Sequence, residues 1–329
     1  MKSYPLVSVL IPAYNAEQWL AESIQSAMSQ TWPRIELIIV DDGSRDETLR
    51  IARQFASESV KVVTQPNRGA SAARNHALSL AQGDFIQWLD ADDVLAPDKV
   101  STQLRNAVDG DPGLLLSCSV GSFHRSLKRA KFEGNALWKD HDPVSWIVAK
   151  FANNAWMNPA AWLVSRQLTT AAGPWNEELS LDDDGEYFCR VVAASNHVRF
   201  IPEARIFYRH WMTGSLSRRN SDSACRSLLT SLSLSIATLR SLEDSARTRS
   251  ASLHYLSVFF HYFYPGKTAM IAEIQDLAAE LGSCLVPPKL DFKYSVIEKL
   301  FGWQAVRVLR AEVASLRLRL AVSIDKLEM

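Results

Sequence analysis

Residues 83–93 read GDFIQWLDADD, a short apolar strand that ends in three carboxylates within four residues. Earlier segments have the same form, because the apolar runs 6–11, 35–40 and 60–64 each give way to polar residues. Segments whose apolar residues have helical spacing lie between these strands, at 16–30, 46–55 and 70–81. A further helix begins near Pro97. Strands that alternate with helices predict an α/β fold with a mostly parallel sheet flanked by helices.

Polar residues collect at the carboxyl end of each predicted strand. They are Tyr14-Asn15, Asp41-Asp42-Gly43-Ser44, Asn67-Arg68-Gly69 and Asp90-Ala91-Asp92-Asp93. The carboxyl ends of parallel strands lie at one edge of the sheet, where open α/β sheets bind their ligands. The sequence therefore predicts a binding site at this edge.

The overall composition excludes several classes of protein. The 329 residues contain 36 Lys and Arg against 36 Asp and Glu, without the basic excess typical of a nucleic-acid binder. The four cysteines include no C-x-x-C pair, which argues against a disulfide framework or a zinc site. No apolar run approaches the length of a membrane span. We expect a cytoplasmic protein whose closest membrane association is peripheral, at the inner face of the cell membrane.

The first strand is not followed by a glycine-rich phosphate loop. No glycine precedes Gly43, and no G-x-G occurs in the chain. Phosphates of a ligand would need another partner, and Asp90 with Asp92 can supply one through a divalent cation. Carboxylate oxygens suit Mg²⁺ or Mn²⁺, which in turn bridges phosphate oxygens. The alternative is a solvated acidic turn that caps the helix near Pro97.

A second acidic run occurs at residues 182–184, before the apolar helical face formed by Tyr187, Phe188 and Val191. Three adjacent carboxylates repel one another, so we expect at least one raised pKa unless they are exposed or metal-bound. A raised pKa suits a general base that removes a proton from a hydroxyl. The alternative, helix N-capping, accounts for one of the three acids.

Four motifs together resemble the family 2 glycosyltransferases, inverting enzymes of the GT-A fold. The motifs are VSVLIPAYN at 7–15, VDDGS at 40–44, NRGASAARN at 67–75 and GDFIQWLDADD at 83–93. The resemblance is dense over residues 6–100 and continues more weakly to about 218. It implies a nucleotide-diphosphosugar donor and a Mn²⁺ or Mg²⁺ cofactor.

The resemblance also implies roles in donor binding. Asp42 would accept a hydrogen bond from the base, and a uracil imide fits this role, so we expect a UDP-sugar. Asp92 would bind the metal directly, and Asp90 would contact the ribose or the metal through water. Asp93 matches a common additional acid of the motif or caps the next helix. The other positions implied for donor binding are Pro12, Ala13 and Tyr14 near the nucleoside and Arg68 at the nucleotide. The segment FYRHW at 207–211 resembles the Y-R-x-H region of the family, which implies His210, assisted by Arg209, as a further metal ligand or a phosphate donor, with a structural role as the alternative.

On the acceptor side, the resemblance places the catalytic base six residues before an Arg on a helix. Counting back from Arg190 gives Asp184, with Asp183 as the alternative, and Glu186 as a residue that binds acceptor hydroxyls. Five tryptophans lie within residues 138–175. Indole rings stack well on sugars, and we select Trp156 and Trp162 as acceptor contacts, although each also suits a hydrophobic core.

The region after residue 218 reads as a helical extension. We divide the chain into a GT-A domain at 1–218, with a nucleotide-sugar half (1–110) and an acceptor half (111–218), and an extension at 219–329. An apolar stripe from Leu253 to Phe263 fits core packing or a membrane-facing surface. The 3-4 apolar spacing over 303–329 predicts a short coiled coil and self-association. Residues 1–200 carry five more acidic than basic groups, and residues 201–329 reverse this excess.

These observations predict an inverting hexosyltransferase that acts by metal-assisted single displacement. We expect it to move a sugar from a nucleotide-diphosphosugar to a hydroxyl of a saccharide or lipid-linked acceptor, in cell-surface polysaccharide or glycolipid synthesis. Two alternatives remain at this point. One is a sugar nucleotidyltransferase, which usually has a glycine-rich loop after the first strand. The other is a non-catalytic nucleotide-sugar-binding assembly protein.

Overall fold

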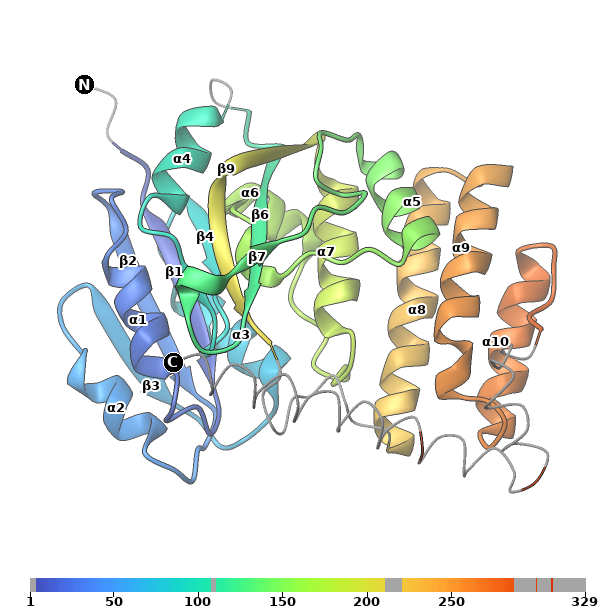
Figure 1. Cartoon of the computed structure of the whole chain (residues 1–329), viewed down its shortest axis with the longest axis horizontal. Coiled ribbons are helices and arrows are strands. Elements are labelled where there is room, and N and C mark those ends of the chain that lie inside the picture. Colours follow the sequence, from blue (N-terminus) through green and yellow to red (C-terminus); the bar gives the residue numbers. More distant parts are fainter. Residues whose placement is uncertain (1–3, 108–110, 211–220, 287–299, 301–308, 310–329) are drawn as a thin grey trace. The chain divides into compact units, whose positions relative to one another are not determined.

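The structure is a computed structural model, and it describes residues 4–107, 111–210 and 221–286, together with residues 300 and 309. Two compact units are distinguished along the chain, Met1–Tyr255 and Leu256–Met329. The first unit contains two β-sheets and the helices around them, and the described part of the second is helical (Figure 1).

The first sheet has five strands in the order β3-β2-β1-β4-β8. β1, β2, β3 and β4 are parallel, and β8 is antiparallel to β4. The strands are β1 (Val7–Ala13), β2 (Ile35–Asp41), β3 (Val60–Thr64), β4 (Phe85–Trp88) and β8 (Val164–Ser165). The central strand β1 is almost entirely buried, as expected for a parallel strand covered on both faces. Ala13 pairs with Asp41, which brings the ends of β1 and β2 together.

The connecting helices lie on both faces of this sheet. They are α1 (Leu20–Met28), α2 (Thr48–Gln54) and α3 (Ala70–Leu80). α1 and α2 connect strands in the direction of β3, whereas α3 returns from β3 to β4. Because such crossovers are right-handed, α3 packs on the opposite face, against β1 and β2.

A second sheet follows β4, in the order β5-β9-β6-β7. Its strands are β5 (Val94–Leu95), β6 (Leu114–Phe123), β7 (Lys131–Phe132) and β9 (His197–Arg209), and helix α4 (Lys99–Asn106) packs on it. β9 runs parallel to β6 and antiparallel to β5, and the register with β6 shifts between Cys118 and Ser119. Because β5 directly follows the acidic turn after β4, β9 ends beside that turn.

Helices beyond the sheets complete the first unit. They are α5 (Pro143–Asn153), α6 (Arg166–Ala172), α7 (Asp183–Ala194), α8 (Asp222–Leu242) and α9 (Ala246–Phe259), with short 3-10 turns η1 (Leu127–Arg129) and η2 (Pro159–Ala161). α7 packs against α5, α6 and α8. We predicted that the catalytic domain ends at residue 218, whereas the first compact unit continues to Tyr255, because α8 packs directly on α7.

The described part of the second unit contains the end of α9, the turn η4 (Phe260–Tyr262) and α10 (Thr268–Glu280). Of the apolar stripe predicted here, Leu256, Phe260 and Phe263 are buried, which fits core packing. None of the helices in the described ranges combines the length and apolar character needed to cross a bilayer. The predicted coiled coil at 303–329 lies outside the described residues except for Leu309.

Candidate active site

The acidic turn after β4 places three carboxylates in different environments. Asp90 is partly exposed and accepts a hydrogen bond of 2.9 Å from Arg74. Asp92 is also partly exposed, and burial together with the charge of Asp90 raises its pKa to about 6. Asp93 is fully buried. Asp90 and Asp92 are therefore the acids of this turn that a ligand can reach.

Asp93 is a structural residue in this turn. Its two oxygens accept hydrogen bonds from the backbone N–H of Arg209 (2.9 Å) and from the Asn158 amide (2.8 Å). Burial raises its pKa well above the ordinary range. Asp93 thus joins the turn to β9 and to η2, and its side chain does not cap α4, which begins after Asp98.

Arg209 supports the same turn. Its side chain is 1% exposed, and Nε donates to the backbone carbonyl of Asp92 over 2.9 Å. The guanidinium also contacts Glu22 and lies over the rings of Trp19 and Phe123, at 4.1 Å and 4.4 Å. A buried cation held this firmly fixes the backbone from which Asp92 projects.

The two reachable carboxylates fit a divalent cation with few protein ligands. Mg²⁺ and Mn²⁺ in nucleotide sites take one or two carboxylates and complete their shell with phosphates and water. The pKa of Asp92 is raised first by burial and then by the negative charge of Asp90, and a bound cation would favour the ionised form against both. Within the described residues, no group of three or more His, Cys, Asp and Glu side chains could hold a metal. His210 instead contacts Ser122, with 3.1 Å between Nε2 and Oγ.

Asp42 organises the loop that follows β3. Its Oδ1 accepts from the Gln65 amide (2.8 Å) and the Arg68 backbone N–H (2.9 Å), and its Oδ2 accepts from the Gly69 N–H (2.8 Å). A carboxylate offers about four acceptor positions, so about one remains for a ligand. The residue is 2% exposed.

The other residues predicted for donor binding differ in exposure. Tyr14 is 45% exposed at the end of β1, whereas Ala13 is buried and Pro12 is partly buried. The side chain of Arg68 is exposed and pairs with Glu177 over 2.7 Å. The ends of β1, β2 and β3 therefore combine an accessible aromatic ring (Tyr14), a buried carboxylate (Asp42) and an accessible guanidinium (Arg68).

The three acids at the start of α7 each have different hydrogen-bond partners. Asp182 contacts Ser231 of α8, and Asp183 accepts from Arg74 (2.7 Å) and Ser71 (3.2 Å). Asp184 accepts from the backbone N–H of Gly185. Burial, with the charges of Asp183 and Asp182, raises the pKa of Asp184 to about 7, against the lowering effect of Arg74.

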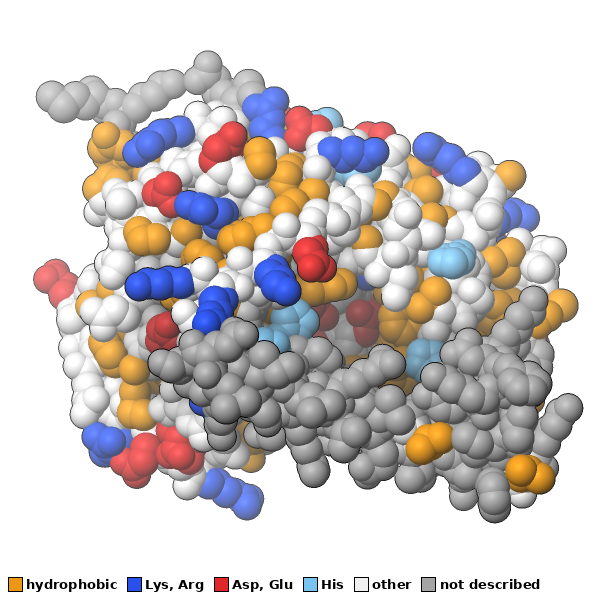
Figure 2. Space-filling view, viewed as in Figure 1, with side chains coloured by type: hydrophobic (Ala, Val, Ile, Leu, Met, Phe, Trp, Pro, Cys, Tyr) orange, Lys and Arg blue, Asp and Glu red, His pale blue; other side chains and the backbone are white. Residues whose placement is uncertain are grey.

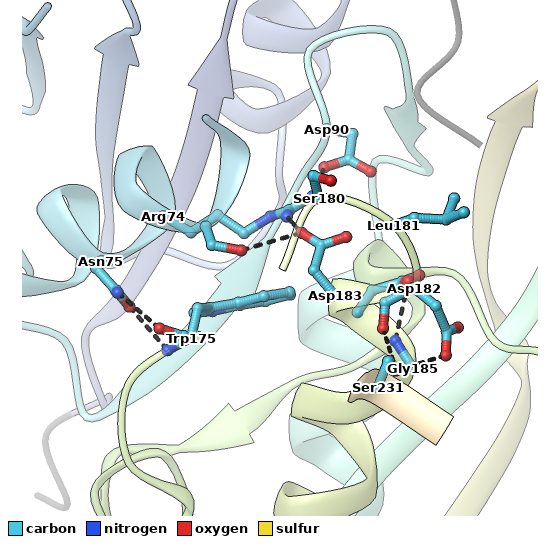
Figure 3. Close-up of polar contacts among 12 residues, drawn as sticks. Arg74, Asn75, Asp90, Trp175, Ser180, Leu181, Asp182, Asp183, Gly185 and Ser231 are labelled. Carbon is cyan, nitrogen blue, oxygen red and sulfur yellow. Dashed lines mark hydrogen bonds and ion pairs between the residues drawn. The ribbon is translucent and has the colours of Figure 1, made fainter. Parts of the chain in front are cut away.

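Arg74 joins the two acidic clusters, as the close-up shows (Figure 3). It projects from α3 between Asp90 and Asp183, and its guanidinium lies 4.4 Å from the ring of Trp175. The next residue, Asn75, exchanges two hydrogen bonds with the backbone of Trp175. The motif at 67–75 thus joins α3 to the segment that leads into α7. In the space-filling view, acidic side chains are visible in a recess near the centre (Figure 2).

The residues predicted to contact the acceptor differ in exposure. Trp156 is 47% exposed and packs edge-on against Tyr208. Trp162 is fully buried and stacks on Phe188, so the prediction that it contacts the acceptor is wrong and it is a core residue. Glu186 is buried and forms two hydrogen bonds with Arg190, which occupy both of its carboxylate oxygens.

Two residues with clear roles here, Arg74 and Lys150, are not among the residues predicted from the sequence. Arg74 lies inside the motif at 67–75 and could have been singled out there. Lys150, on the apolar helix α5, is buried near Asp182 and gives no local signal in the sequence. Its role depends on its proximity to Asp182, which arises only in the folded chain.

Comparison with known proteins gives a consistent result. Residues 8–155 match the family model described as glycosyl transferase family 2. A segment of 139 residues, 42% of this chain, is 42% identical to chondroitin synthase of Escherichia coli, of which it covers 19%. A segment of 103 residues, 30% of this chain, is 44% identical to an uncharacterized glycosyltransferase of Haemophilus influenzae, of which it covers 41%. The matches therefore span less than half of either relative.

Solved structures with the same fold extend further along the chain. Residues 1–349 of TarS from S. aureus, in complex with UDP-GlcNAc, align with a TM-score of 0.65 at 17% identity, over 83% of this chain and 81% of that one. The mannosyltransferase PcManGT of Pyrobaculum calidifontis, in complex with GDP-Man and Mn²⁺, aligns with a TM-score of 0.54 at 18% identity, over 96% and 81%. At this identity the likeness shows the GT-A type of fold.

Proposed function

Residues 8–155 of this chain form a family 2 glycosyltransferase domain, and from this premise we propose that the chain transfers a sugar from a nucleotide-diphosphosugar to an acceptor hydroxyl with inversion. The observation that carries the proposal is that the three acids at the start of α7 have different hydrogen-bond partners. Asp182 and Asp183 have side-chain partners, and the carboxylate of Asp184 accepts only the Gly185 N–H among the hydrogen bonds of the described residues. A carboxylate with a pKa of about 7 suits a general base.

We place the donor over the carboxyl ends of β1 and β2. Pro12, Ala13 and Tyr14 pack near the nucleoside, Arg68 contacts the nucleotide, and Asp42 offers an acceptor for the base. A uracil imide donates one hydrogen bond, which matches the acceptor capacity left on Asp42, so we favour a UDP-sugar. UDP-GlcNAc and GDP-Man are the donors bound in the TarS and PcManGT structures.

In the proposed reaction, the Asp184 carboxylate takes the proton of the acceptor hydroxyl while that oxygen attacks the anomeric carbon. The bond from the anomeric carbon to the diphosphate oxygen breaks on the opposite face, and the nucleoside diphosphate leaves with the bonding electron pair. An α-linked donor therefore gives a β-linked product. A Mn²⁺ or Mg²⁺ ion held by Asp92, with Asp90, would supply charge neutralisation for the departing diphosphate.

The acceptor surface is proposed to include Trp156, whose exposed ring offers an apolar face for a sugar. Glu186 is proposed to act by orienting Arg190, because both of its oxygens are engaged. We propose a setting in cell-surface polysaccharide or glycolipid synthesis, at the cytoplasmic face of the membrane. The similarity to a segment of chondroitin synthase, a polysaccharide-forming enzyme by its name, supports this setting.

The test is release of nucleoside diphosphate from a panel of UDP- and GDP-sugars with Mn²⁺, repeated with Asp184→Asn. We expect the variant to lose on the order of 10²–10⁴ in turnover while it binds the donor as the wild type does. Glu178→Gln, an exposed acid six residues earlier, is the matched control and should behave as the wild type.

Three outcomes would contradict the proposal. Failure of every nucleotide sugar to bind would exclude a donor site. Formation of a UDP-sugar from UTP and a sugar phosphate would identify a nucleotidyltransferase. Donor binding without turnover, unchanged by Asp184→Asn, would identify a non-catalytic binding protein.

A further inference from the structure

Asp182 occupies an unusual position directly beneath the start of α7. Its backbone is left-handed, with φ 59° and ψ 30°, and its carbonyl accepts the N–H of Glu186 over 3.2 Å. The carboxylate folds back under Gly185, where an added Cβ would lie 2.2 Å from Oδ1. A side chain at 185 would therefore displace this carboxylate from its position. Asp182 points inward, whereas Asp183 points to Arg74 (Figure 3).

Two serines of α8 hold the chain on either side of Leu181. Ser231 Oγ lies 2.7 Å from Oδ2 and 2.8 Å from the carbonyl oxygen of Asp182. Ser227 Oγ accepts the N–H groups of Ser180 (2.8 Å) and Leu181 (2.9 Å). Residues four apart on a helix share one face, so α8 presents both hydroxyls to the segment that leads into the acidic run.

Lys150 and Tyr255 complete a buried polar cluster around Asp182. Lys150 Nζ donates to the Tyr255 hydroxyl over 3.0 Å, and the Tyr255 ring stacks on Phe151 at 4.2 Å. Lys150 is 6% exposed and Tyr255 is 1% exposed. A buried ammonium requires a compensating negative charge, and the acids around Asp182 are its source. Burial acts to lower the pKa of Lys150, but Tyr255 and Asp182 outweigh it and the pKa is raised.

We propose that Lys150, Ser231 and Tyr255 are positioning residues that hold the partly buried Asp182 as an anchor and thereby fix the start of α7, from which Asp184 projects. The proposal rests on the proposed function, in which Asp184 is the base. Of these residues, Ser231 and Tyr255 lie beyond residues 8–155, the segment that matches the family. α8 and α9, which supply Ser231 and Tyr255, thus contribute to the placement of the base, because an error of about 1 Å in the position of a reacting group can cost about 10² in rate.

The experiment compares Ser231→Ala and Tyr255→Phe with Ser235→Ala in the full chain. Ser235 lies one turn further along α8 and is buried, but among the described residues no hydrogen bond joins its hydroxyl to Asp182, so it is the matched control. We expect Ser231→Ala and Tyr255→Phe to lower kcat by about 10- to 100-fold, as misplacement of the base predicts, with the Kd for UDP within about twofold of wild type. Ser231→Thr, which keeps the hydroxyl, should restore most of kcat.

A second variant, Asp182→Asn, removes the negative charge but keeps the shape of the side chain. Asparagine also tolerates the left-handed backbone at this position. The charged groups that act on Asp184 are Asp182, Asp183, Arg74 and Lys150. Loss of the negative charge at 182 should move the acidic limb of the kcat/KM profile to lower pH by about half a unit or more. A purely structural role for Asp182 would leave that limb in place.

The outcomes separate this inference from the proposed function. If Asp184→Asn stays active, the base assignment fails. If Asp184→Asn is inactive but Ser231→Ala and Tyr255→Phe match Ser235→Ala, the positioning proposal is overturned alone. If Ser231→Ala or Tyr255→Phe does not fold, the Asp182→Asn pH profile decides: an unshifted limb overturns the proposal and a shifted limb supports it.

Discussion

Arg74 donates a hydrogen bond of 2.7 Å to Asp183, although 109 residues separate them in the chain. The same guanidinium bonds Asp90 over 2.9 Å, and the Arg74 side chain is 8% exposed. One buried cation therefore fixes the distance between the acids after β4 and the acids that begin α7. The proposed metal-binding and base-bearing segments are held in register by this single side chain.

Replacement of Arg74 by Met should strongly destabilise the fold. It leaves the largely buried carboxylate of Asp183 without its cation, a change that typically costs about 3–5 kcal/mol. Urea denaturation would measure the free energy of unfolding. Arg105→Met, at an exposed position on α4, is the control and should stay within about 0.5 kcal/mol of wild type. Equal stability of the two variants would show that Arg74 does not hold the acids together.

The sequence predicted the first sheet well because β1 and β2 are continuous, mostly buried apolar runs, and β3 and β4 are short segments dominated by apolar residues. It did not predict β9, which contains Pro202, Glu203 and Arg205 and has one partly solvated face. The two-residue strands β5, β7 and β8 carry no pattern of their own, because their partners specify them. These strands depend on pairings between distant residues, such as Val94 with Phe207.

The residues of the candidate site likewise include some that a local sequence pattern marks and others that it does not. The acids at 90–92 and 182–184 stand out because carboxylates follow a buried strand or precede an apolar helix. Their partners do not stand out, because Arg74 and Lys150 reach them only in the folded chain. Trp156 and Trp162 look alike in the sequence, and only packing separates the exposed ring from the buried one.

Asp184 should set the pH dependence of activity. A base must be deprotonated, so kcat/KM should rise with pH through about 7, the value to which burial, Asp183 and Asp182 raise its pKa. Initial rates from pH 5 to 9, at saturating donor and at acceptor concentrations well below KM, would measure it. A pH-independent kcat/KM across this range would contradict the assignment.

Asp184 should also make the fold less stable as pH rises. Its folded pKa of about 7 exceeds the ordinary value of 3.8, so between these values the native state binds more protons than the unfolded state. The free energy of unfolding therefore falls as pH rises through this window. Asp184→Asn, which mimics the protonated acid, should match wild type near pH 4 and exceed it at pH 8 by up to about 4 kcal/mol. Glu178→Gln, at an exposed site, should show no such pH-dependent difference in thermal unfolding.

Asp92 should couple the binding of metal and nucleotide. Mn²⁺ with UDP should raise the Tm of the wild-type protein, because a ligand that binds only the native state stabilises it, by about 2.7 kcal/mol at 100 times Kd. Asp92→Ala should lose most of this increase, whereas Asp98→Ala, at an exposed position shortly after the same turn, should retain it. An increase with UDP that is insensitive to EDTA and to Asp92→Ala would show that no metal acts at this turn.

The two tryptophans, Trp156 and Trp162, should separate acceptor binding from folding. Trp162→Ala removes a fully buried indole between Phe188 and Trp146, so it should cost about 3–5 kcal/mol of unfolding free energy. Trp156→Ala removes a ring that is 47% exposed, so it should leave stability nearly unchanged and raise the KM for the acceptor several-fold, with the donor KM unaltered. Denaturation curves and transfer kinetics on the same preparations would test both. An unchanged acceptor KM in Trp156→Ala would place the acceptor away from this ring and leave the donor side of the proposal intact.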